Sequence, residues 1–183
     1  MMTASAPASP SFDGGDDGNG WTDRFGGKLV LVLLDNKHAP SIKNGRSLWG
    51  LHDPLSYAPQ DRRHTVTVPA GFVTDLTSVP RFAWMVLPPD GPSVKAAVIH
   101  DFLYATSGTG SWKRHPTAIT RERPYSRSEA DNILREALKN RGVGVLRRNI
   151  IWVAVRVGGA RGWGLDASRQ ARRQAVDEAQ VTG

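Results

Sequence analysis

Short apolar runs separated by turn residues fill the first half of the chain, a pattern typical of β-strands. The continuous apolar run at 28–34 predicts a buried strand. Residues 65–68 alternate with a period of two, Pro69 interrupts them, and strand character resumes at 70–73 after a predicted kink or bulge. Residues 49–57 contain a turn signal at their centre and fit either short edge strands or a loop.

The second half changes to helical spacing. An almost wholly apolar run predicts a buried helix over 94–105, with Ser93 as its N-cap. Ser126 opens a second helix with capping-box spacing, and Gly142 ends it. One face of that helix is apolar and carries Ala130, Ile133, Leu134, Ala137 and Leu138. Residues 145–157 predict a third helix, or a strand because several of them are β-branched.

These patterns predict one α+β domain at 27–164, in which a small, mainly antiparallel sheet from the first half packs against two or three helices from the second. Residues 1–26 form an acidic segment that we expect to be disordered. Residues 107–124 lack periodicity, and we expect an exposed, mobile loop there. Residues 165–183 form a basic tail whose 166–179 stretch favours a helix.

Composition and charge narrow the function classes. The chain has no cysteine, which excludes disulfides, thiolate metal ligands and a cysteine nucleophile. It shows neither a signal peptide nor an apolar run of about 20 residues, so we expect a soluble protein without a membrane span, retained in a cytoplasm. Ten Lys and Arg stand against two carboxylates between 135 and 173, and such a stretch can be a solvated face or can bind an anionic partner or nucleic acid. Aromatic residues do not interleave with these arginines in the way that a surface for stacking single-stranded bases would need.

The polar pair His100-Asp101 lies inside the apolar helix predicted at 94–105. Burying a carboxylate without a partner is costly, so both side chains need partners from packing, a metal or chemistry. Tyr104 lies one turn after His100 and shares its face. Asp131 borders the apolar stripe of the second helix and is a further candidate buried carboxylate.

Two further residues, Asp75 and Ser78, follow the strand predicted at 70–73, where functional loops are often found. If the elements bring these residues together, His100 and the carboxylates Asp75, Asp101 and Asp131 form a site for one divalent metal ion. In a catalytic interpretation His100 and Asp101 act as base and orienter, while Tyr104 and Ser78 position substrate. The alternative is a satisfied structural network of His100 with Ser78, Tyr104 or Arg127.

No other nucleophile or phosphate-binding motif is persuasive. Ser78 lies outside any nucleophile-elbow pattern, and residues 108–111 lack the lysine and helix of a phosphate loop. The remaining histidines lie in polar stretches and are expected to face solvent: His38, His52, His64 and His115.

Three motifs resemble a known family. They read VPAGFVTDLTSVPR (68–81), LPP (87–89) and AVIHDFLY (97–104). The chain is similar over about 29–163 to the DUF1353 family, a domain of unknown function encoded largely by tailed phages and prophages. The family's characteristic polar positions correspond here to Asp75, Ser78, His100, Asp101 and Asp131.

The resemblance implies a phage or prophage gene product that acts in the host bacterial cytoplasm or in the virion, and it implies no established reaction. Two functions follow. One is a metal-dependent hydrolase built on the His-Asp site. The other is a non-enzymatic virion component, such as a tail protein, or an assembly factor, in which the same residues hold the fold. Its basic C-terminal region would then dock on acidic phage structural proteins.

Overall fold

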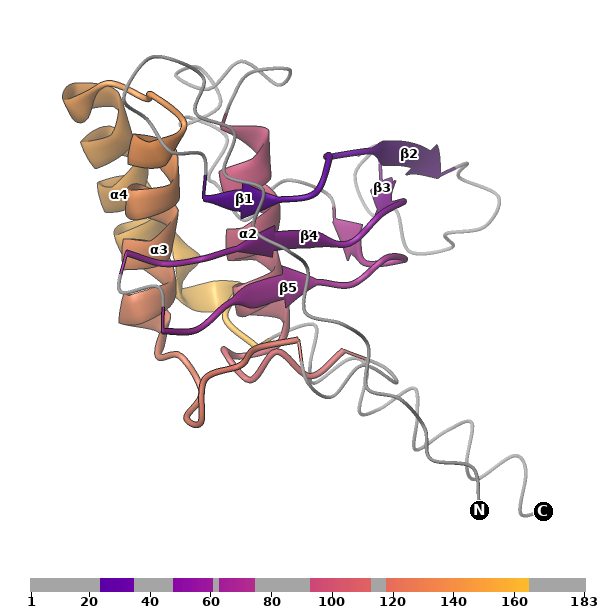
Figure 1. Ribbon diagram of the computed structural model, residues 1–183. Coiled ribbons are helices and arrows are strands. Elements are labelled where there is room, and N and C mark those ends of the chain that lie inside the picture. Colours follow the sequence, from indigo (N-terminus) through magenta and orange to yellow (C-terminus); the bar gives the residue numbers. More distant parts are fainter. Residues whose placement is uncertain (1–23, 35–47, 61–62, 75–92, 113–117, 165–183) are drawn as a thin grey trace, which may run out of the picture.

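The computed structural model describes residues 24–34, 48–60, 63–74, 93–112 and 118–164. Within them, two three-stranded antiparallel sheets precede three helices, which confirms the predicted α+β class (Figure 1). One sheet has the order β1-β4-β5, formed by β1 (Phe25–Gly26), β4 (Leu55–Tyr57) and β5 (Val66–Val68). The other has the order β2-β3-β6, formed by β2 (Leu31–Leu34), β3 (Leu48–Leu51) and β6 (Val73–Thr74).

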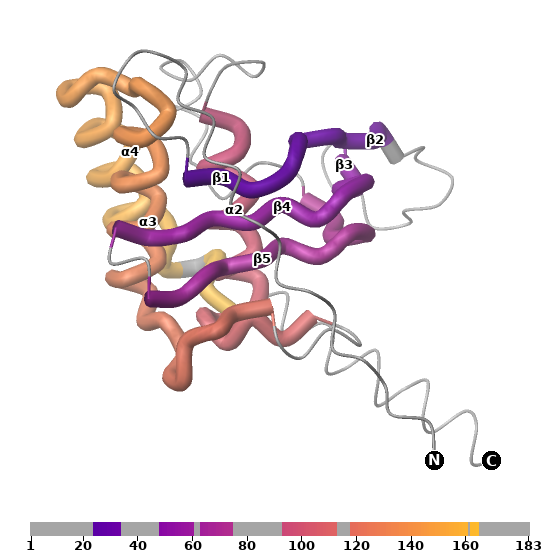
Figure 2. Tube along the Cα trace, viewed as in Figure 1, coloured from indigo at the N-terminus to yellow at the C-terminus, as the bar shows by residue number. Residues whose placement is uncertain are grey.

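The helices stack in sequence beside the sheets. The central helix α2 (Val94–Ala105) packs against β4, β5 and β6 on one side and against α3 (Arg127–Asn140) on the other. The next helix, α4 (Val145–Gly158), packs against α3 and continues into the short 3-10 helix η2 (Gly159–Arg161). The tube in Figure 2 shows the same order, with α4 farthest from the strands. Within the described residues, no helix is both long enough and apolar enough to cross a bilayer.

The core lies where α2 meets the sheets. Residues 96–105 of α2 are all buried. Phe72 packs edge-on against Phe102, with ring centroids 5.4 Å apart, and against Trp112 at 4.8 Å. Because α2 is enclosed by β-strands on one side and by α3 on the other, polar side chains on it must find partners inside the protein.

Local signals explain α2 and α3, and both helices form where they were predicted. The Ser126 side chain accepts a hydrogen bond from the Glu129 backbone N–H, and the Glu129 side chain completes the predicted capping box. Gly142 follows α3 with φ of +76°, a conformation that favours glycine. Ser93 does take the N-cap position of α2, but its side chain makes no capping hydrogen bond because its backbone is already helical.

Several strand predictions need correction. Residues 48–57 form β3 and β4, which are the central strands of their sheets and not edge strands; Pro54 lies between them, so no ladder hydrogen bond is lost. The run at 28–34 yields only β2, which pairs with β3 alone among the described strands, so Val32 and Leu33 are exposed and not buried as predicted. The predicted kink after Pro69 is the passage of the chain from one sheet to the other.

In the second half of the chain, the structure decides one prediction that was left open and corrects another. Residues 145–158 are helical, which settles the choice between helix and strand in favour of α4. The loop expected to be exposed at 107–124 is only partly exposed where it is described: residues 122–124 are exposed, whereas Trp112 and Ala118 are buried. The Ala118 carbonyl accepts a hydrogen bond from the Thr67 N–H, and Ile119 bridges to Val66. Gly108 is buried there with φ of +76°. The segments 1–23 and 165–183, with the helix expected at 166–179, lie outside the described residues.

Candidate functional site

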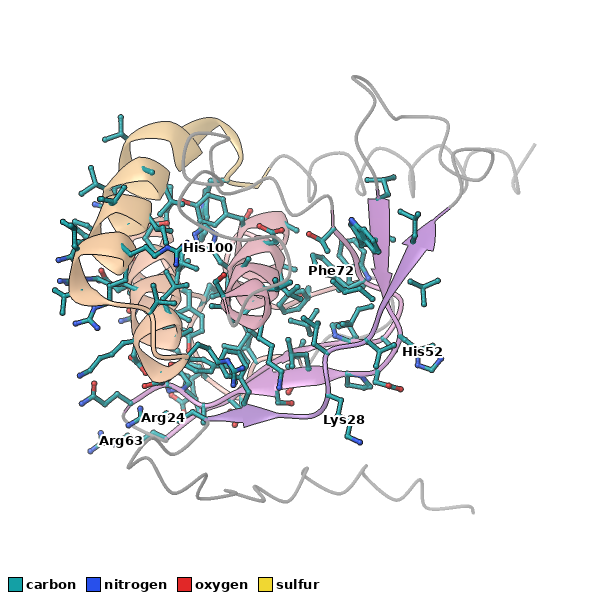
Figure 3. The ribbon with its side chains drawn as sticks, turned by 90° about the horizontal axis from the view of Figure 1, so that it is seen from above. Arg24, Lys28, His52, Arg63, Phe72 and His100 are labelled. Atoms are coloured by element: carbon teal, nitrogen blue, oxygen red, sulfur yellow. The ribbon has the colours of Figure 1, made fainter. Side chains whose placement is uncertain are left out.

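Helices α2 and α3 bring His100, Tyr104 and Asp131 into direct contact. His100 and Tyr104 lie one turn apart on α2, with ring centroids 4.2 Å apart. Asp131 Oδ1 lies 3.1 Å from His100 Nε2 and accepts a 2.6 Å hydrogen bond from the Tyr104 hydroxyl. His100 and Asp131 are both 0% exposed. Figure 3 shows His100 between α2 and the pair of helices α3 and α4.

A cation from α4 completes the charge balance. The Arg156 guanidinium donates to Asp131 Oδ2 at 3.2 Å and remains 33% exposed. Burial alone would raise the pKa of Asp131, but hydrogen bonds from His100, Tyr104 and Arg156 outweigh it and hold the pKa below its ordinary value. Asp131 is therefore an ionised acceptor, and His100 Nε2 carries the proton that it shares with Oδ1. We call these four residues the Asp131 network.

The end of α4 and the segment after it enclose Tyr104. The Trp163 ring packs edge-on against Tyr104 at 5.1 Å, and the Gly164 N–H donates to the Tyr104 carbonyl at 3.0 Å. A methyl group on Gly159 would lie 2.7 Å from the Tyr104 hydroxyl oxygen, so this position has room only for glycine. Burial and the Asp131 carboxylate raise the pKa of Tyr104, and the nearby Arg127 guanidinium offsets only part of that rise.

Asp101 faces the β-sheet, whereas its neighbour His100 faces α3. Its Oδ2 accepts a 2.5 Å hydrogen bond from the Thr74 hydroxyl of β6, and the side chain is buried. The structure thus pairs Asp101 with the sheet and Asp131 with His100, on different sides of α2. Asp75 and Ser78, the other predicted site residues, lie outside the described residues.

The metal-ligand set therefore stays a prediction. Across the described ranges, no group of three or more His, Asp and Glu side chains is placed to hold a metal ion. His100 Nδ1 is buried and has no hydrogen-bond partner among the described residues. With Nε2 held by Asp131, Nδ1 is the ring atom that remains for a ligand or a proton.

Of three residues that contact the predicted site residues, the sequence indicated one, Arg127, and not the other two, Arg156 and Thr74. Arg127 was among the predicted network partners, and it does lie beside the Tyr104 hydroxyl. Arg156 and Thr74 were missed as partners. The signal for Arg156 was weak, because it was one of ten basic residues in its stretch. Its role depends on how α4 crosses α3, which spacing alone does not fix.

A second polar cluster joins the β1-β4-β5 sheet to α3. The Tyr57 hydroxyl donates to Glu136 Oε1 at 2.8 Å and accepts from Asn140 Nδ2 at 2.7 Å. Arg24 pairs with the same Glu136 oxygen at 3.3 Å. Burial and the Glu136 carboxylate raise the pKa of Tyr57 strongly, so its hydroxyl stays protonated. This cluster holds α3 against the sheet on the side opposite to α4.

Glu129 anchors the loop that precedes α3. Its carboxylate pairs with Arg121 at 2.6 Å and with Arg123 at 2.8 Å, besides closing the capping box with Ser126. Partial burial would raise the pKa of Glu129, but the Ser126 N–H and the two guanidinium groups lower it to about 2.

Two other histidines were expected to face solvent. His52 is exposed, as expected, and its Nδ1 lies 3.0 Å from the Asp53 carboxylate. His64 is only partly exposed, because its ring packs against Tyr125 with centroids 5.5 Å apart, so that expectation was wrong. His38 and His115 fall outside the described residues.

Comparison with known proteins gives a family and no individual relative. No curated protein and no solved structure matches the chain. A family model does match, over residues 49–155, a span that includes β4, β5, β6, α2, α3 and most of β3 and α4. It contains His100, Tyr104 and Asp131 and ends one residue before Arg156, and the family is described as a "protein of unknown function (DUF1353)". The chain belongs to the DUF1353 family.

Proposed function

We propose that the chain is a non-enzymatic structural or assembly protein and that the Asp131 network ties helices α2, α3 and α4 together. The observation that carries this proposal is that both oxygens of Asp131 already have partners: His100 and Tyr104 on Oδ1, and Arg156 on Oδ2. The partners come from α2 and α4, while Asp131 itself belongs to α3. One buried carboxylate thus links α2, α3 and α4.

The electrostatics support a structural role. A buried carboxylate needs a nearby positive charge and hydrogen bonds to offset its desolvation. Arg156 supplies the charge, and two further donors bind the other carboxylate oxygen. A divalent ion at Asp131 would have to displace these donors and would meet the Arg156 guanidinium.

The biological setting of this proposal comes from the family resemblance. A family encoded largely by tailed phages and prophages implies a virion component, such as a tail protein, or an assembly factor in the host cytoplasm. The basic residues near the C-terminus fit an acidic surface on a phage structural protein; in the described part, α4 contributes Arg147, Arg148 and Arg156 and carries no carboxylate.

One observation favours a second candidate, the metal-dependent hydrolase. His100 Nδ1 has no partner in the described part of the chain, and a carboxylate on the opposite nitrogen is the usual way to orient a metal-binding imidazole. In this alternative Asp131 positions His100, whose Nδ1 binds the ion. Asp75 completes the ligands together with Asp101, which would have to exchange its hydrogen bond from Thr74 for the ion. Tyr104 and Ser78 position substrate.

Thermal unfolding with added Zn²⁺, Mn²⁺, Mg²⁺ or a chelator distinguishes the two functions. The structural role predicts equal melting temperatures in all four conditions and a large destabilisation in His100→Gln. The matched control is His52→Gln, which changes an exposed histidine and leaves stability unchanged. A metal at 100 times its dissociation constant would add about 2.7 kcal/mol of stability. A shift of that size, lost in His100→Gln and kept in His52→Gln, would establish the metal site instead.

A further inference from the structure

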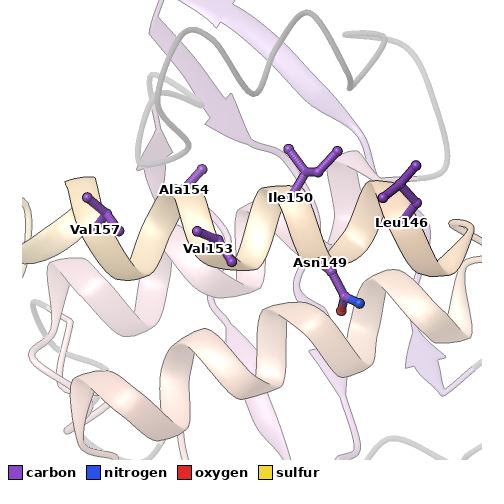
Figure 4. A pocket seen from close by; sticks show the side chains of 6 residues that line it. All are labelled: Leu146, Asn149, Ile150, Val153, Ala154 and Val157. Carbon is purple, nitrogen blue, oxygen red and sulfur yellow. The ribbon is translucent and has the colours of Figure 1, made fainter.

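The outer face of α4 is an exposed apolar surface. Its large side chains are 76% exposed at Leu146, 42% at Ile150, 50% at Val153 and 79% at Val157. With Asn149 and Ala154 they line the shallow groove drawn in Figure 4. A contiguous apolar patch of a few hundred Å² is about as large as a monomeric protein usually exposes, and such patches are often binding surfaces. We call Leu146, Ile150, Val153 and Val157 the α4 seam.

The spacing of the α4 seam is that of a helix-pairing surface. Its residues are separated by four, three and four positions, which places them in one stripe along the helix. The core-facing residues Ile151 and Val155 are 0% exposed and lie on the opposite side of α4. The seam is therefore a second apolar face, beyond what α4 needs in order to pack within its own domain.

We propose that the α4 seam binds the α4 seam of a second copy of this chain, with the two helices antiparallel across a two-fold axis. A spacing of four, three and four reads the same in both directions. An antiparallel copy therefore sets Leu146 opposite Val157 of the second copy and Ile150 opposite Val153 of the second copy. Each seam residue meets an aliphatic partner, as an isologous interface requires.

Charge favours the antiparallel arrangement over the parallel one. Arg147 lies in the first turn of α4, where the helix dipole disfavours a cation, and α4 has no acidic residue in that turn. In a parallel pair, the two Arg147 side chains would lie at the same end and repel each other. In the antiparallel pair, each Arg147 lies near the carboxyl end of the other α4, where the dipole favours positive charge and where the cation of the last turn, Arg156, is already paired with Asp131.

The area fits a weak, concentration-dependent dimer. The exposed parts of the four seam side chains amount to roughly 400 Å² per copy. Two copies would therefore bury about 800 Å² through the seam alone, so flanking side chains must contribute the rest of a specific interface, which begins at about 1,000 Å². None of the four seam residues belongs to the Asp131 network, so dimer formation does not depend on whether His100 is structural or binds a metal.

Sedimentation velocity of the full chain at concentrations up to about 100 μM tests the association. We expect the mass of a dimer, and the mass of a monomer for Val153→Glu, which places a charge at the centre of the seam. Leu33→Glu is the matched control, because it puts the same charge on an exposed leucine of β2 and should leave the dimer intact. Circular dichroism melts verify that both variants fold. A wild-type protein that stays monomeric throughout would overturn the proposal.

Disulfide trapping tests the arrangement, because the chain has no cysteine of its own. Leu146→Cys mixed with Val157→Cys should form a cross-linked dimer under mild oxidation, whereas Leu146→Cys alone should not. Cross-linking of Leu146→Cys alone would refute the antiparallel packing. If Leu146→Cys is monomeric and its new thiol is nevertheless protected from maleimide, the seam is covered by another segment of the same chain, which also refutes the proposal.

Discussion

Replacing Asp131 with Asn removes the charge of the network and keeps its shape. The amide oxygen can still accept from His100 and Tyr104, but hydrogen bonds to a charged acceptor contribute about 1.5 to 3 kcal/mol each against about 1 kcal/mol for neutral ones. Weakening both bonds therefore costs about 2 kcal/mol. The lost Arg156 pair, one third exposed, adds at most about 1 kcal/mol. We expect Asp131→Asn to lower the free energy of unfolding by about 3 kcal/mol in total.

Urea unfolding at pH 7 measures this loss as a lower midpoint at an unchanged slope. Asp53→Asn makes the same chemical change at an exposed carboxylate beside His52, and it should shift the unfolding free energy by less than about 0.5 kcal/mol. Because the pKa of Asp131 is lower when folded than its ordinary value of 3.8, its contribution is complete above that pH and is lost as the pH falls through the folded pKa. If Asp131→Asn unfolds within about 0.5 kcal/mol of wild type, the network does not stabilise the fold and our reasoning is wrong.

Three further predictions concern other positions. The pKa of Glu129 is about 2 in the folded protein, against an ordinary value of 4.5. Its contribution to the free energy of unfolding is therefore complete above pH 4.5 and is lost as the pH falls toward 2. Urea midpoints of Glu129→Gln should vary less over that range than those of wild type. Gly159→Ala should cost about 1 to 3 kcal/mol by displacing the Tyr104 hydroxyl, whereas Gly144→Ala, with open space around it, should cost less than about 1 kcal/mol in the same assay. Tyr57→Phe should lower the unfolding free energy by about 1 kcal/mol, and an unchanged midpoint would show that its two hydrogen bonds contribute nothing.

The helices could be predicted because their signals are local. An apolar run and a capping box fix α2 and α3 within a few neighbouring residues. The division into two sheets could not be predicted, because strands of two to four residues are defined by pairings between distant segments, such as β1 with β4. The same reason explains β2, whose apolar sequence suggests burial, although it lies at the edge of its sheet among the described strands and leaves Val32 and Leu33 exposed.

The site was predictable in part. The four-residue spacing of His100 and Tyr104 fixed their common face, and the position of Asp131 beside an apolar stripe indicated its burial. The partner of each group depends on how the elements cross. Asp101 is paired with Thr74 and Asp131 with Arg156 because of the angles at which β6 and α4 meet their neighbours, and no local pattern encodes those angles.

The role of His100 is tested most directly by a ¹⁵N NMR spectrum of its imidazole, identified by the loss of its signals in His100→Gln. The structural account predicts a protonated Nε2, hydrogen-bonded to Asp131, and ring nitrogen shifts that stay constant when Zn²⁺ or Mg²⁺ is added. A change in the Nδ1 shift that saturates with added metal would contradict the account and assign His100 to a metal site.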